Sequence, residues 1–333
     1  MLVPVASVKK QGSIENLKAF NCLQGCRMKQ FEVIGFGALN MDKLYRVNKI
    51  ATADEESFVI DFEEACGGSA ANTMVGLAKL GCKVGFIGKV ADDREGRMLL
   101  EDFRREGVDT NGVIMARRGR SGTAMGFVDE KGERALYIDP GVNDTIELNE
   151  INREYAFQTR FLHLTSFVGE KSFQTQKRLV ETLPKNIKIS LDIGELYAIK
   201  GLEALEPLLD RTFVMMPNAK ELQILTKKAD YRRNAELLLE KGAEIVAVKL
   251  GGRGCYVTDG KESCMIEAFE VKAVDTTGAG DAFCAGFLYG LISGRSLYEC
   301  GRLGNFVASR CITKMGARAG LPRLTDLIKN KLA

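Results

Sequence analysis

The sequence predicts an α/β fold: a three-layer α/β/α sandwich with a mostly parallel central sheet and a small β-sheet lid. From Phe31 onward, short apolar segments alternate with segments of helical periodicity, which is typical of βαβ units. Two segments, from about 43–64 and 113–138, interrupt this alternation with strand-like patterns and can pair into one sheet beside the main domain, as a lid. No internal repeat or low-complexity linker is visible, so we expect one domain over 31–333.

Apolar runs bounded by glycines predict the elements of the first half in order. The expected strands are FEVIGFGALN (31–40), buried and ending in small residues; SFVIDFEEA (57–65), an edge or lid strand; and KVGFIGKV (83–90). The expected helices are GGSAANTMVGLAKLG (67–81), closed by Gly81, and EGRMLLEDFRREG (95–107). TAMGFVDEKGERALYI (123–138) predicts a hairpin that turns at 130–132.

The second half returns to alternating strands and helices. The expected strands are RFLHLTSF (160–167), IKISLDIG (187–194), RTFVMMPN (211–218) and EIVAVKLG (244–251). The helices between them include QTQKRLVETL (174–183) and NAELLLEKG (234–242). Since such strands run parallel, functional residues are expected where their carboxyl ends and loops converge.

Composition excludes several classes of protein. The 333 residues are 45% hydrophobic and 27% charged, so a substantial core is expected rather than disorder. The 47 basic and 44 acidic residues are well mixed, which argues against nucleic acid as a partner. No apolar run approaches the roughly 18 residues that span a bilayer, so no membrane partner is expected either.

Cysteine and histidine usage narrows the chemistry further. The nine cysteines are scattered and odd in number, so neither a zinc ribbon nor a disulfide framework is indicated, and a cytoplasmic location is expected. Cys22 and Cys26 could form a metal pair but lack partners. His163, the single histidine, lies in an apolar run and is expected in the core. Residues 1–30 are expected to be an appended arm, with Met28 as a possible natural start.

The common nucleotide-binding motifs are absent from the sequence or incomplete in it. No GxxxxGK[ST] segment occurs, which excludes a P-loop fold, and no HRD or DFG constellation of protein kinases is present. GFGALN, after the first strand, has two glycines of a dinucleotide fingerprint but carries Asn40 in place of the third. An oxidoreductase is therefore a weak alternative.

The segment VDTTGAGDAFCAGFLYGL (274–291) joins a glycine turn to an apolar helix. Gly278, Ala279 and Gly280 let backbone amides approach a ligand, and unpaired amides at a helix start form an anion site. Asp281 either caps the helix or accepts the proton of an attacking hydroxyl. The helix start favours its ionised form, so an elevated pKa is not required. Phosphoryl transfer tolerates a weak base because positioning and charge stabilisation carry most of the catalysis.

The segment 67–81 supplies a second binding motif. Gly67 and Gly68 allow the backbone to approach a polyol, and Asn72 can both donate and accept hydrogen bonds. The alternative is a plain glycine turn before a helix.

Together the two motifs resemble the signatures of the ribokinase-like (PfkB-type) carbohydrate kinase family: 67–81 its amino-terminal signature, and DTTGAGDAFCAG (275–286) its carboxyl-terminal one. The resemblance covers roughly Phe31 to the end and implies the ribokinase-like fold. It implies that Asp281 is the catalytic base, with Gly278, Ala279 and Gly280 as the anion hole.

The same resemblance implies the remaining site residues. It implies that sugar hydroxyls bind to Asn40, Asp42, Gly67, Gly68 and Asn72, and that ATP lies near Lys249, Gly251, Gly254 and Asn305. Magnesium would be organised through water by Asn218 and Glu221. Potassium would activate at Asp275 and Thr277, with backbone carbonyls near 311–316. Lys249 stands where threonine is common, and either meets a phosphate or is a surface charge.

The sequence thus predicts an ATP-dependent kinase that phosphorylates a hydroxymethyl group of a small sugar. Nucleosides of the adenosine type and 2-keto-3-deoxy sugar acids are alternative substrates, and Ser69, where ribokinase usually has lysine, weakens ribose itself. A catalytically silent nucleotide or sugar sensor is the non-kinase alternative. A homodimer is expected if the lid leaves an edge strand or an apolar face open.

Overall fold

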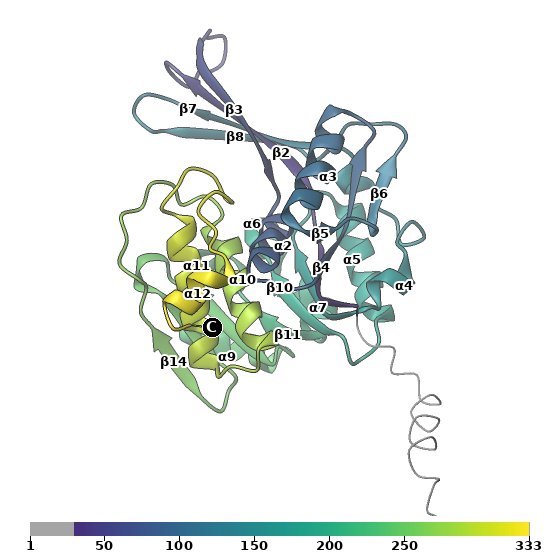
Figure 1. Ribbon diagram of the computed structural model, residues 1–333, viewed down its shortest axis with the longest axis vertical. Coiled ribbons are helices and arrows are strands. Elements are labelled where there is room, and N and C mark those ends of the chain that lie inside the picture. Colours follow the sequence, from purple (N-terminus) through teal and green to yellow (C-terminus); the bar gives the residue numbers. More distant parts are fainter. Residues whose placement is uncertain (1–29, 333) are drawn as a thin grey trace, which may run out of the picture.

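The computed structural model describes residues 30–332 (Figure 1). The predictions for the Cys22 and Cys26 pair, for Met28 and for the arm up to residue 29 fall outside the described residues. None of the helices within 30–332 combines the length and the hydrophobicity that a transmembrane span requires.

A ten-stranded sheet forms the middle layer, in the order β14-β13-β12-β11-β10-β9-β1-β4-β5, with β6 also pairing with β4. All pairs are parallel except β12 with β13 and β13 with β14, which are antiparallel. The strands are β1 (Phe31–Phe36), β4 (Val84–Ala91), β5 (Val108–Asp109), β6 (Val113–Ala116), β9 (Thr159–Thr165), β10 (Lys188–Asp192), β11 (Thr212–Met215), β12 (Ile245–Lys249), β13 (Cys255–Thr258) and β14 (Ser263–Ile266).

Helices cover both faces of this sheet and bury one hydrophobic core on each. One face packs against α2 (Ser69–Lys79), α3 (Arg94–Glu106), α10 (Ala279–Ile292), α11 (Leu297–Cys311) and α12 (Leu324–Lys329). The other packs against α4 (Arg153–Ala156), α5 (Glu170–Thr182), α6 (Gly194–Ala198), α7 (Gly201–Leu209), α8 (Ala219–Thr226) and α9 (Tyr231–Glu240). The three-layer prediction is confirmed.

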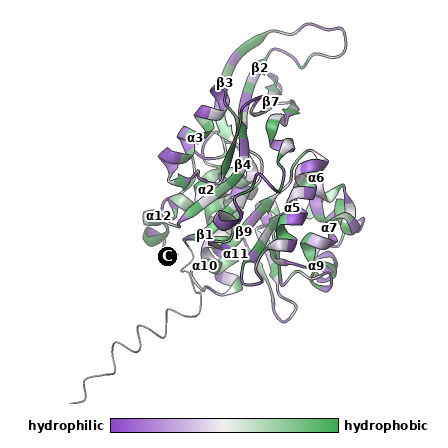
Figure 2. Ribbon diagram, turned by 90° about the vertical axis from the view of Figure 1, so that its right-hand side faces the viewer, coloured by the Kyte–Doolittle hydropathy of each residue, from purple (hydrophilic) through white to green (hydrophobic). Residues whose placement is uncertain are grey.

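A second sheet, called here the small sheet, projects from the body of the molecule (Figures 1 and 2). Its strands, in the order β3-β2-β7-β8, are β2 (Asn40–Val47), β3 (Val59–Gly67), β7 (Gly122–Val128) and β8 (Arg134–Asp139). It joins the two segments that interrupt the alternation and includes the predicted hairpin. The division of the chain into an arm and a single domain stays a prediction.

Two boundaries differ from the expectation. The first strand ends at Phe36 and not at Asn40, because the side chain of Asn143 bonds both backbone groups of Leu39 and directs the chain into the small sheet, where Asn40 opens β2. The segment 113–116 was expected in the lid. It extends the main sheet instead, since β6 pairs with β4 along Gly88–Ala91.

Candidate active site

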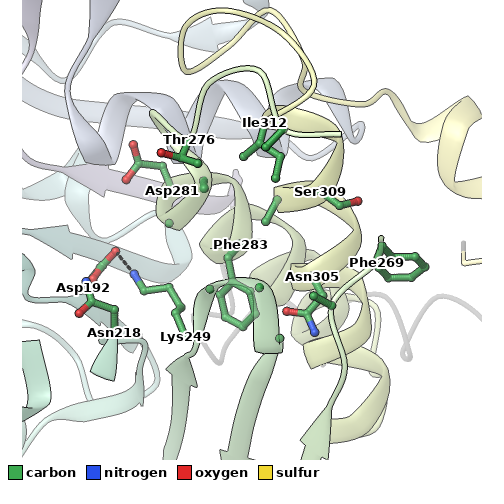
Figure 3. A pocket seen from close by; sticks show the side chains of 18 of the residues that line it. Asp192, Asn218, Lys249, Phe269, Thr276, Asp281, Phe283, Asn305, Ser309 and Ile312 are labelled. Atoms are coloured by element: carbon green, nitrogen blue, oxygen red, sulfur yellow. Dashed lines mark hydrogen bonds and ion pairs between the residues drawn. The ribbon is translucent and has the colours of Figure 1, made fainter. Parts of the chain in front are cut away.

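A cavity of about 660 Å³ opens where β10 and β12 end and α10 begins (Figure 3). This is the edge of the sheet at which functional residues are expected. Nine of the predicted site residues line it: Asn218, Glu221, Lys249, Gly251, Gly254, Ala279, Gly280, Asp281 and Asn305. The predicted sugar-binding residues gather between α2 and the small sheet, next to Asp281.

The start of α10 has the backbone that the anion-hole prediction requires. Gly278 is the N-cap in the left-handed conformation, with φ 75°, and a Cβ there would lie 2.5 Å from the Cβ of Ala317. No side chain caps this helix. The amide of Ala279 donates to the carbonyl of Thr276 at 3.2 Å, so this amide is already paired. The amides of Gly278 and Gly280 are therefore the ones that we expect to bind the anion.

Asp281 does not cap α10; its carboxylate is bound from a different helix. Its Oδ2 accepts a hydrogen bond from Asn72 Nδ2 of α2 at 2.8 Å. Burial raises the pKa of Asp281 to about 7, although the hydrogen bond from Asn72 acts in the opposite direction. The helix start was expected to favour the ionised form, but removal of Asp281 from water has the larger effect and favours the protonated form. A pKa near 7 suits a general base.

The predicted sugar pocket is built around Asp42. A Cβ on Gly67 would lie 2.1 Å from Asp42 Oδ2, so the carboxylate occupies the space that a side chain would need. Burial raises the pKa of Asp42 to about 6. Asn40 pairs with Gly67 across β2 and β3, and its Oδ1 accepts a hydrogen bond from Asn143. Gly68 begins α2 with φ 101°.

Lys249, at the end of β12, has 12% of its side chain exposed and forms an ion pair with Asp192 at 2.7 Å (Figure 3). The surface-charge alternative is therefore wrong. The pKa of Lys249 lies above its ordinary value because the charges of Asp192 and its neighbours outweigh the effect of burial. A Cβ on Gly280 would lie 3.3 Å from Lys249 Nζ, so this ammonium group reaches the start of α10.

The other predicted ATP-binding residues line the opposite end of the cavity. Gly251 and Gly254 have positive φ, and a Cβ on Gly254 would collide with the carbonyl of Ile266. Asn305, on α11, uses its Nδ2 to hold the carbonyls of Ile266 and Glu267, each at 3.0 Å. Asn305 thus fixes the loop after β14 that forms the cavity wall.

Asn218 and Glu221 meet at the start of α8 as a reciprocal cap. Asn218 Oδ1 accepts from the amide of Glu221, and Glu221 accepts from the backbone and side-chain amides of Asn218 through its two carboxylate oxygens. Burial raises the pKa of Glu221. The buried Oδ1 of Asp192, in the same cavity, has no partner. The side-chain oxygens of Asn218, Glu221 and Asp192 fit a magnesium ion that is held through water molecules, since Mg²⁺ keeps several waters and needs few carboxylates.

The segments predicted to hold potassium do meet, but their groups bind one another. Asp275 Oδ1 accepts from the backbone and hydroxyl of Thr277, and Oδ2 accepts from the amide of Gly316. The amide of Val274 donates to the carbonyl of Ile312 at 2.8 Å. Potassium stays a prediction. Within 30–332, no group of three His, Cys, Asp or Glu residues is arranged to hold a metal.

Three site residues escaped the sequence reasoning. Asp192 ends strand β10, so the rule of strand ends pointed to it, but no motif did. Asn143 holds Asn40, and Arg318 holds Asn72 Oδ1 through Nε at 2.7 Å. Nothing in the sequence marked these two, because their partners are more than a hundred residues away.

His163 is a core residue, as expected. It is fully buried in β9, its Nδ1 lies 2.9 Å from Ser190 Oγ, and burial lowers its pKa to about 4. The cysteines of the described range are all free.

Comparison with known proteins identifies the family to which the chain belongs. Residues 30–324 match the family described as pfkB family carbohydrate kinase. An uncharacterized sugar kinase of Archaeoglobus fulgidus is 52% identical over 255 residues, covering 76% of this chain and all of that protein. A ribokinase of Haemophilus influenzae is 28% identical over 299 residues, covering 88% and 96%. The crystal structure of a ribokinase from Thermotoga maritima superposes with a TM-score of 0.80 and 27% identity, covering 90% of this chain and all of that one.

The fold and the matches define a phosphotransferase that uses an alcohol group as acceptor. The chain belongs to the pfkB family of carbohydrate kinases, with the ribokinase fold. Membership in this family implies ATP as the phosphoryl donor.

Proposed function

We propose that this chain transfers the γ-phosphoryl group of ATP to a hydroxymethyl group of a small sugar. The observation that carries the proposal is the contact between Asp281 and Asn72, which joins the phosphate-binding helix start to the sugar-binding helix at one carboxylate. Two relatives named above are ribokinases, which supports a sugar as acceptor. Nucleosides and 2-keto-3-deoxy sugar acids remain the alternatives within the family.

In the proposed mechanism Asp281 accepts the proton of the acceptor hydroxyl as its oxygen bonds to the γ-phosphorus, and the bond from that phosphorus to the ADP oxygen breaks. The amides of Gly278 and Gly280, with the ammonium group of Lys249, stabilise the charge on the transferred group. Asp42 and Asn40 hold other hydroxyls of the sugar and orient the reacting one. A magnesium ion near Asn218 and Glu221 would neutralise phosphate charge.

The experiment is a panel of pentoses, other furanose sugars, nucleosides and 2-keto-3-deoxy sugar acids, assayed for ATP consumption with magnesium, with and without potassium. We expect a sugar to give the highest kcat/KM. A nucleoside or a sugar acid as best substrate would replace the sugar proposal, and binding without ATP consumption by any compound would favour the silent sensor. Dependence on potassium would support the site at Asp275 and Thr277.

We also propose a homodimer that pairs through the small sheet. The edge strands β3 and β8 carry exposed apolar side chains, and Figure 2 shows hydrophobic segments on the projecting sheet. They include Val59, Ile60 and Phe62 on β3, and Leu136, Tyr137 and Ile138 on β8. Exposed apolar edge strands are sites of pairing with another chain.

A further inference from the structure

Arg318 lies in the loop between α11 and α12, and its guanidinium group is largely buried, with 12% of the side chain exposed. Nη1 forms an ion pair with Asp102 of α3, Nε donates to Asn72 Oδ1 at 2.7 Å, and Nη2 donates to the carbonyl of Gly67 at 3.4 Å. One planar group thus binds α3, the glycine turn and α2. A lysine ammonium also has three donors, but they share one freely rotating nitrogen, so it would not hold the three partners in one fixed plane.

These contacts determine how the amide of Asn72 is oriented. A guanidinium group only donates, so the Asn72 atom that faces Arg318 must be the oxygen. The amino end of the same amide then points to Asp281 Oδ2, at 2.8 Å. In the flipped orientation, Asn72 would turn its oxygen toward the carboxylate and its donors toward a cation, and both contacts would be lost.

We propose that Arg318 is a positioning residue for phosphoryl transfer, which acts through Asn72 to hold Oδ2 of Asp281 and leave Oδ1 for the acceptor hydroxyl. The inference rests on the proposed role of Asp281 as base. Arg318 lines a second cavity, of about 530 Å³, together with residues of α3 and β3. Asn72 lies between Arg318 and Asp281, since its side chain is hydrogen-bonded to both. Arg318 therefore orients the base without contacting the reacting atoms.

The ion pair with Asp102 explains how the guanidinium group stays in place. Both side chains are about nine-tenths buried, and such pairs add little net stability because desolvation offsets their attraction. Arg105 pairs with the same carboxylate from the outside, with 69% of its side chain exposed. Within the described residues, Arg105 has no hydrogen bond to Asn72. A substitution of Arg105 is therefore a matched control for a substitution of Arg318.

Other groups also act on Asp281, and the test must separate them from Asn72. The charged and titratable neighbours come from β10, β12, α10, α11 and the loop before α12: Asp192, Lys249, Cys284, Cys311 and Arg318. Arg318 can lower the pKa of Asp281 through its charge alone or through the amide that it orients. The route through the oriented amide requires Asn72, and the route through charge alone does not.

The experiment is a pH titration of the Asp281 carboxyl by ¹³C NMR, with the resonance assigned by its loss in Asp281→Asn. It compares the wild type with Arg318→Met, Arg105→Met, Asn72→Ala and the double variant Asn72→Ala/Arg318→Met. We expect Arg318→Met to raise the pKa by about one unit and Arg105→Met to leave it unchanged. In the Asn72→Ala background the effect of Arg318→Met should fall to less than half. Arg318→Lys keeps the charge, so it should raise the pKa of Asp281 by less than Arg318→Met does. It replaces the methionine variant in the test if that variant does not fold.

An equal shift with and without Asn72 would overturn the proposal, since it would show that charge alone acts. No shift in Arg318→Met, or a wild-type pKa in Arg318→Lys, would also overturn it. In turnover assays, the acidic limb of the Arg318→Met profile should move by the same amount, which is about tenfold in rate at pH 6. The NMR titration needs no turnover, so an inactive wild type would contradict the proposed function and leave this test intact.

Discussion

At the scale of single residues, the site depends on carboxylates held in low-dielectric surroundings. Asp281 and Asp42 both have raised pKa values, near 7 and near 6, because burial disfavours their charged forms. In the proposed mechanism Asp281 accepts the proton of the reacting hydroxyl, and Asp42 holds another hydroxyl of the sugar. Carboxylates with perturbed pKa values are frequent at catalytic sites.

The raised pKa values predict how activity depends on pH. A general base must be ionised, and a raised acid pKa means that the ionised form is lost as pH falls through 7. We therefore expect kcat/KM to fall about tenfold per pH unit below pH 7, and more steeply below pH 6, where Asp42 also protonates. A profile measured from pH 5 to 9 checks this, and a flat profile down to pH 5 would contradict it.

Lys249 and Asp192 form the second charged feature at residue scale. Lys249→Met would leave Asp192 as a buried, unpaired charge, which should lower the free energy of unfolding by about 3–5 kcal/mol. The double variant with Asp192→Asn should recover part of that loss, because no charge is then left unpaired.

Urea unfolding measures both changes. Lys220→Met is the matched control, because Lys220 pairs with Glu195 at the surface with 71% of its side chain exposed. We expect that control to lose about 1 kcal/mol at most. Equal losses for the two lysines would show that the buried pair has no special role.

At the scale of elements, the site forms where β2, β3 and the starts of α2 and α10 meet. Gly67 closes β3 directly against the Asp42 carboxylate, so Gly67→Ala should displace that carboxylate. Losing a charged hydrogen bond to the sugar should raise its KM roughly tenfold or more. Steady-state kinetics with the preferred sugar measure the change.

Gly126→Ala, in β7 of the same sheet, is the control for this prediction. Its Cβ would meet only the flexible end of Leu44, at 3.2 Å, and the side chain of Arg134 beyond it. We expect its KM to stay near that of the wild type. If Gly67→Ala behaves like Gly126→Ala, Asp42 does not hold the sugar.

The helices and strands also show how much of the fold and of the site can be predicted from the sequence. The alternating pattern predicted the layers, and the glycine motifs predicted the starts of α2 and α10, because these features are local. Asp192 and Arg318 were missed because their roles come from contacts formed only by folding. Arg318 and Asp102 are 216 residues apart, and neither lies in a motif. The burial that raises the pKa of Asp281 likewise depends on distant segments, so local reasoning about the helix start missed it.

At the scale of the whole molecule, the small sheet leaves the body and exposes apolar edge strands. If two copies pair through these strands, the wild type should have twice the mass of the 36.6 kDa chain at micromolar concentration. Ile60→Asp, on β3, should yield monomers. Ile199→Asp is the control, since Ile199 is 66% exposed but lies at the end of α6. Light scattering after size exclusion measures both, and a monomeric wild type would exclude the dimer.

If Asp281 is the base of a sugar kinase, Asp281→Asn should remove phosphoryl transfer and leave the fold intact. Asparagine keeps the shape and can still meet Asn72, and it removes a buried charge, so thermal unfolding should occur no lower than in the wild type. We expect turnover with the preferred sugar to fall about 1,000-fold, while ATP binding measured by calorimetry changes little. Undiminished turnover in the folded variant would show that Asp281 is not the base.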